Sequence, residues 1–94
     1  MRLKPNEVAA IKTTILNLDS DADIFLFGSR TDDSKKGGDI DIVILSRRLT
    51  TGDDKRAIKK VLYGLLGEQK IDIILAADDA DPFVKLALQT GVKL

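Results

Sequence analysis

The sequence contains neither cysteine nor histidine, and these two absences exclude most common catalytic chemistries. Without cysteine the chain has no disulfide, no thiol nucleophile and no thiolate metal site. Without histidine it lacks the usual general base, the usual zinc ligand and any serine–histidine triad. Any chemistry must therefore use carboxylates, lysine, arginine, hydroxyl groups or a metal ion bound through oxygen.

Aromatic residues and excess charge are also scarce. Aromatics make up 4% of the 94 residues, so we expect a core of mostly aliphatic side chains. Fifteen basic and fifteen acidic residues give a net charge of zero, which argues against non-specific nucleic-acid binding. No signal peptide and no run of membrane-spanning length is recognisable, so we expect a cytoplasmic protein. At this length we expect residues 1–94 to form a single domain.

Hydrophobic periodicity predicts the element order α-β-loop-β-α-β-α. Spacings of three and four between apolar residues indicate helices at residues 6–18, 53–66 and 82–89. Runs of β-favouring residues predict strands at residues 24–27, 39–45 and 71–77, with residues 91–94 as a final extended piece. Thr51 is expected to cap the second helix and Gly67 to end it. The pattern predicts an α/β (α+β) domain in which helices pack on a small sheet.

The tripeptide Asp39-Ile40-Asp41 opens the second predicted strand. Asp is unfavourable in strands, and a buried carboxylate is costly unless it is paired or bound to a cation. Strand alternation places Asp39 and Asp41 on one face, about 7 Å apart, so both side chains can reach one metal ion. The alternative is that both acids are solvated at a strand end, and for an isolated Asp-x-Asp that is the more common outcome.

Two further features change how the acidic pair is interpreted. Gly28-Ser29 follows the first predicted strand, where a glycine turn lets backbone amides approach a phosphate. Asp72 is the one acid inside the third apolar strand. Each has an ordinary alternative, a strand-to-loop turn for the first and an exposed strand face for the second. Together, three carboxylates from two neighbouring strands can hold two divalent ions and orient a hydroxyl for displacement at phosphorus.

The combined pattern resembles the signature of the minimal nucleotidyltransferases of the DNA polymerase β superfamily. It consists of Leu26-Phe27-Gly28-Ser29-Arg30, then Asp39-Ile40-Asp41-Ile42, then a third acid at Asp72. The resemblance covers nearly the whole chain and implies the nucleotidyltransferase fold, a small mixed β-sheet with helices packed on it.

The resemblance also implies a role for each matched residue. Asp39 and Asp41 would bind two Mg²⁺ ions with the nucleotide phosphates, and Asp72 would hold one metal and help activate the acceptor hydroxyl. Gly28 and Ser29 would grip the β- and γ-phosphates of a nucleoside triphosphate, expected to be ATP, with Arg30 as a further phosphate contact. Lys35 and Lys36 lie in the same loop, where a solvated surface is the favoured interpretation.

Minimal members of this superfamily resemble one half of a two-component system. Their partner is an all-helical protein of the higher eukaryote and prokaryote nucleotide-binding (HEPN) type, in some pairs a ribonuclease toxin to which the small antitoxin attaches AMP. The resemblance therefore implies transfer of AMP to a hydroxyl on such a partner, in a hetero-oligomer or by a homodimer. Two alternatives stay open: a non-catalytic subunit that neutralises a helical partner by contact, and an unrelated α/β domain with chance acids.

Overall fold

The computed structural model describes residues 3–27, 40–67 and 70–94. Four strands form one sheet in the order β3-β2-β1-β4, namely β1 (Asp23–Phe27), β2 (Ile40–Leu45), β3 (Ile71–Ala76) and β4 (Val92–Lys93). β2 and β3 are parallel, whereas β1 runs antiparallel to both β2 and β4. The sheet is therefore mixed, as the resemblance implied.

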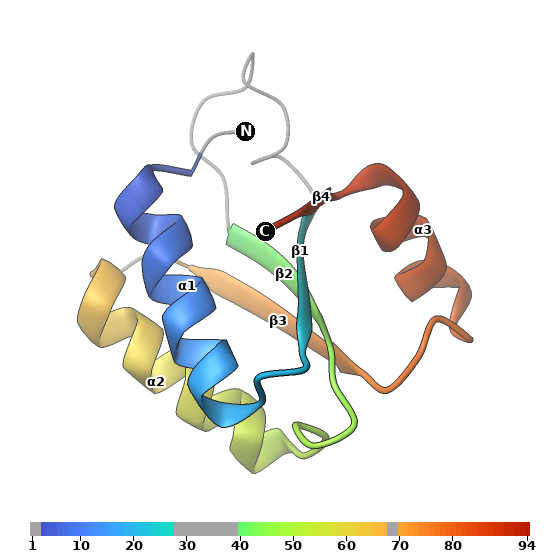
Figure 1. Cartoon of the computed structure of the whole chain (residues 1–94), viewed down its shortest axis with the longest axis horizontal. Coiled ribbons are helices and arrows are strands. Elements are labelled where there is room, and N and C mark those ends of the chain that lie inside the picture. Colours follow the sequence, from blue (N-terminus) through green and yellow to red (C-terminus); the bar gives the residue numbers. More distant parts are fainter. Residues whose placement is uncertain (1–2, 28–39, 68–69) are drawn as a thin grey trace.

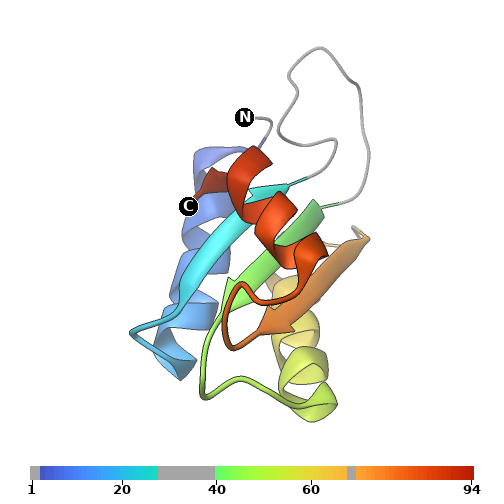
Figure 2. The same cartoon turned by 90° about the vertical axis from the view of Figure 1, so that its right-hand side faces the viewer.

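Three helices cover the two faces of the sheet unequally (Figures 1 and 2). The helices α1 (Pro5–Leu18) and α2 (Gly52–Leu66) pack together on one face, and α3 (Pro82–Thr90) lies on the other. The predicted α/β arrangement is confirmed, and within the described residues each predicted helix and strand is observed, with its described ends within one residue of the prediction. Among the residues described, no helix combines the length and the apolar character needed to cross a membrane.

Strand β2 separates two apolar clusters formed by the described residues. Ile40, Ile42 and Ile44 are fully buried in the larger cluster with side chains of α1 and α2. Val43 faces the opposite way, into the smaller cluster with Val84 of α3. Because side chains alternate along a strand, Asp41 lies on the same face as Val43, which is the face that α3 partly covers.

Both α2 and α3 begin with a capped turn. Thr51 caps α2, because its hydroxyl accepts a hydrogen bond of 3.1 Å from the Asp54 amide. Gly67 ends α2 with a φ of 82°, the left-handed conformation expected at a helix C-terminus. Asp81 caps α3 by accepting hydrogen bonds from two amides of its first turn. The predicted roles of Thr51 and Gly67 are confirmed.

Candidate active site

The sheet aligns Phe27, Asp41 and Asp72 in one row across three strands. Asp41 of β2 is the register partner of Phe27 on β1 and of Asp72 on β3. Neighbouring strands lie about 4.8 Å apart, and residues directly opposite each other point to the same face. Asp41 and Asp72 are therefore adjacent on the α3 face, at the end of the sheet where β2 and β3 begin. Two of the three predicted acids are brought together by the fold.

The two carboxylates form a donor set that suits a hard divalent cation. Both side chains are only partly buried, so solvent and a ligand can reach them. Like charges directly opposite each other on neighbouring strands repel, and a bound cation offsets that repulsion. Carboxylate oxygens are the ligands that Mg²⁺ prefers. Asp41 and Asp72 thus fit the metal that the resemblance implied.

Several of the predicted site residues lie outside the described part of the chain: Gly28, Ser29, Arg30, Asp39 and the loop lysines Lys35 and Lys36. Within residues 3–27, 40–67 and 70–94, no group of three or more carboxylate, histidine or cysteine side chains could hold a metal. Asp41 and Asp72 therefore form a pair in the described structure, and the roles of the other predicted residues stay predictions.

An aromatic pair that sequence reasoning did not identify lies beside the acids. The rings of Phe27 and Phe83 meet edge to face, with centroids 5.7 Å apart and an interplanar angle of 81°. Phe83 follows Pro82 in the first turn of α3, whose cap and apolar periodicity were the only signals in that segment. Neither signal identifies the residue of β1 that Phe83 contacts, because this depends on how α3 crosses the sheet.

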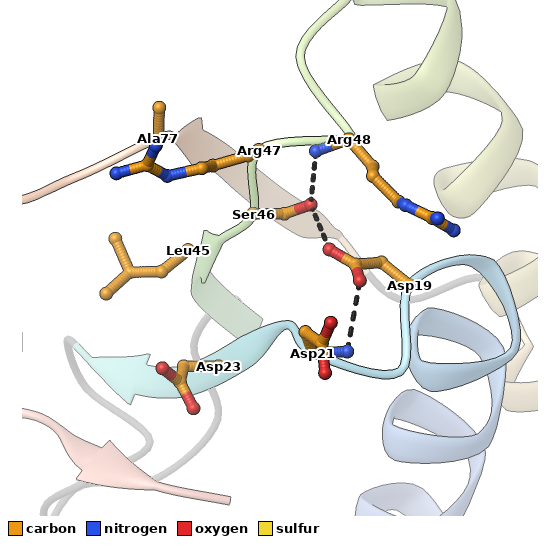
Figure 3. A pocket seen from close by; sticks show the side chains of 8 residues that line it. All are labelled: Asp19, Asp21, Asp23, Leu45, Ser46, Arg47, Arg48 and Ala77. Carbon is orange, nitrogen blue, oxygen red and sulfur yellow. Dashed lines mark hydrogen bonds between the residues drawn. The ribbon is translucent and has the colours of Figure 1, made fainter.

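An open pocket of about 410 Å³, whose lining is drawn in Figure 3, lies at the other end of β2 from Asp41. It is formed where β2 ends and β1 begins, and its lining includes Asp19, Asp23, Leu45 and Arg47. Leu45 lies four positions after Asp41 along β2, a distance of about 13 Å at the usual rise of a strand. This pocket is therefore separate from the candidate active site.

A buried hydrogen-bond network closes one side of this pocket. The Ser46 hydroxyl donates to the Asp19 carboxylate over 2.6 Å and accepts from the Arg48 amide at 3.1 Å (Figure 3). It also accepts from the Leu49 amide at 3.0 Å. The bond from Ser46, followed by one from the Asp21 amide, holds the pKa of the Asp19 carboxyl below its ordinary value of 3.8. The network joins the turn after α1 to the turn after β2.

We expect Ser46→Ala to destabilise the fold in a pH-dependent way. The variant leaves the Arg48 and Leu49 amides without their acceptor, and the bond from Leu49 is buried. This loss costs about 1–3 kcal/mol at neutral pH. In the native protein the lowered pKa of Asp19 contributes stability above its unfolded value of 3.8, and this is lost as the pH falls through the folded value. Ser46→Ala removes the largest cause of that shift. The difference in free energy of unfolding between the native protein and the variant should therefore become smaller below about pH 4.

Urea unfolding at pH 7 and at pH 3 measures both parts of this prediction. Ser20→Ala, which removes an exposed hydroxyl in the neighbouring turn, serves as the matched control and should change little. If the free energies of unfolding of the native protein and of Ser46→Ala differ by the same amount at both pH values, the assigned role of Asp19 is wrong.

The sheet topology and the acidic pair together define a class of protein. A mixed sheet that presents carboxylates from adjacent strands at one end, with helices behind it, is suited to metal-assisted chemistry at phosphorus. The profile of the family described as "Polymerase beta, Nucleotidyltransferase" matches residues 10–94. The chain belongs to this family, whose members typically use divalent metal ions. No curated protein sequence matches the chain.

Proposed function

We propose that this protein is a Mg²⁺-dependent nucleotidyltransferase that moves AMP from ATP to a hydroxyl of a protein partner. The observation that carries the proposal is the pairing of Asp41 with Asp72 on adjacent strands, in a chain of the polymerase beta nucleotidyltransferase family. The proposed partner is an all-helical protein of the HEPN type, such as a ribonuclease toxin, with the present chain as its antitoxin.

Each described acid has a separate task in the proposed reaction. Asp41, together with Asp39, would hold the metal that the triphosphate also binds, and that metal would neutralise charge on the phosphates. Asp72 would hold one of the two metal ions, and it would also orient the acceptor hydroxyl and receive its proton. The acceptor oxygen then bonds to the α-phosphorus, the bond from that phosphorus to the bridging oxygen breaks, and pyrophosphate leaves.

Charge favours a protein acceptor over a nucleic acid. The chain carries as many acidic as basic residues, so it offers little net attraction for a polyphosphate strand. A hydroxyl on a protein surface needs no such excess of positive charge. The all-helical partner is what the family resemblance implies, and the proposed chemistry requires that it present a serine, threonine or tyrosine hydroxyl near Asp72.

Incubation with Mg²⁺, α-labelled ATP and the product of the neighbouring gene, as the candidate helical partner, tests the proposal. We expect label on the partner, an equal amount of released pyrophosphate, and loss of both when the metal is chelated. Mass spectrometry of the labelled partner should show one added AMP on a hydroxyl side chain. Failure to transfer label from any of the four nucleoside triphosphates, both with purified proteins and in cells, would overturn the proposed activity.

A further inference from the structure

We propose that Phe83, supported by Phe27, forms the surface on which the base of the bound nucleotide stacks. This inference rests on the proposed function and assigns the base end of its substrate. Phe83 is 49% exposed although it is a large apolar residue beside a polar site. An edge-to-face pair covers at most one face of either ring, so at least one face of Phe83 is not covered by Phe27.

The position of Phe83 relative to the acids follows from the sheet register. Phe27 is the partner of Asp41, and Asp41 is the partner of Asp72, so the three side chains share one face of the sheet. Phe83 contacts Phe27 from α3, on that same face. The aromatic ring therefore lies on the β1 side of Asp41, and Asp72 lies on the β3 side of Asp41.

The first turn of α3 holds Phe83 in place. The Asp81 carboxylate accepts hydrogen bonds from the amides of Phe83 and Val84, at 2.8 and 3.4 Å. Val84 and Ala87 are buried against Val43 and anchor the helix on the sheet. A ring fixed by a capped turn loses little further freedom when a ligand stacks on it, and such preorganisation favours binding.

The chemistry of this surface fits a nucleobase. Every base has a π-face, and stacking on an aromatic side chain tolerates different bases. A purine has the larger face, so the surface should favour ATP or GTP over CTP or UTP. The metal pair would bind the triphosphate, and the ring would bind the base, so the two ends of one nucleotide would be recognised by different elements of the fold.

Calorimetric binding of two ligands in Mg²⁺ separates the base contact from the phosphate contact. We expect Phe83→Ala to weaken ATP binding between about 5-fold and 100-fold and to leave binding of inorganic tripolyphosphate unchanged. Phe83→Trp should retain ATP binding. Leu86→Ala is the matched control, because Leu86 is a 56% exposed apolar residue of the same helix and should affect neither ligand.

The outcomes distinguish this inference from the proposed function. If Phe83→Ala leaves ATP binding unchanged, or weakens ATP and tripolyphosphate equally, the stacking surface is wrong while the metal site stands. If Asp41→Asn leaves Mg²⁺-dependent binding of both ligands intact, the proposed metal site itself is wrong. If the unaltered chain binds no nucleotide in the presence of Mg²⁺, both proposals are overturned.

Discussion

Asp41→Asn and Asp72→Asn, each made singly, are expected to lower nucleotidyl transfer by at least about 100-fold. Altering even the residues that only orient metal ligands costs about 10- to 100-fold, so loss of a direct ligand should cost more. The neutral amide keeps the shape of the carboxylate but removes its charge. Initial rates with α-labelled ATP and the helical partner, at saturating Mg²⁺, measure the effect.

The matched control for these variants is Asp79→Asn. Asp79 is an exposed acid in the connection between β3 and α3, and this connection follows the opposite end of β3 from Asp72. The substitution removes the same charge from the surface and should leave transfer within about twofold of the native rate. Thermal unfolding of all three variants distinguishes a loss of chemistry from a loss of folded protein. Native rates in both active-site variants would contradict the assigned site.

The same variants decide between catalysis and contact alone. A protein that neutralises its partner by modifying it must lose that effect when Asp41 and Asp72 become amides. A protein that neutralises its partner by binding should retain the effect, because the two side chains together form a small part of any interface. Co-expression of the double variant with the helical partner therefore tests the non-catalytic alternative directly.

The place of each acid within its strand was predictable because it depends on short-range patterns. Alternation identifies the strands Ile40–Leu45 and Ile71–Ala76, and the second residue of each strand is an aspartate. Because the two strands are parallel neighbours, both aspartates lie at the same end of the sheet. The strands and the places of their acids can be recognised without any long-range contact, whereas the pairing of β2 with β3 is itself such a contact.

The contact between Phe27 and Phe83 was not predictable in the same way. It joins residues that are far apart in the sequence, and it depends on where α3 crosses the sheet after leaving β3. The pairing of β4 with β1 also depends on where α3 crosses the sheet, because β4 directly follows α3. A two-residue strand such as Val92–Lys93 has no periodicity of its own. Tertiary packing, rather than local propensity, determines both contacts.

Gly91 is the residue on which this packing depends most closely. It follows α3 and precedes β4, and its amide donates a 2.8 Å hydrogen bond to the Ala87 carbonyl. A Cβ atom added here would lie 2.6 Å from the backbone oxygens of both Ala87 and Leu26. Backbone atoms cannot rotate away as a side chain can, so any larger residue must push α3 away from β1.

We therefore expect Gly91→Ala to destabilise the fold by about 1–3 kcal/mol, the usual cost of overpacking. Gly64→Ala is the matched control, because Gly64 lies in α2 with nothing within 4 Å of the added Cβ. That variant should stabilise the protein by about 0.4–1 kcal/mol, since alanine loses less backbone entropy in a helix. Urea unfolding of both variants measures the difference in sign.

The site gives this prediction a second readout. A shift of α3 away from β1 would move Phe83 relative to Phe27, while Asp41 and Asp72 would stay paired through β2 and β3. Gly91→Ala should therefore weaken ATP binding more than tripolyphosphate binding, under conditions where the variant is still folded. A variant as stable as the native protein would show that the chain end adapts without moving α3, and the inferred link between Gly91 and the nucleotide site would then be wrong.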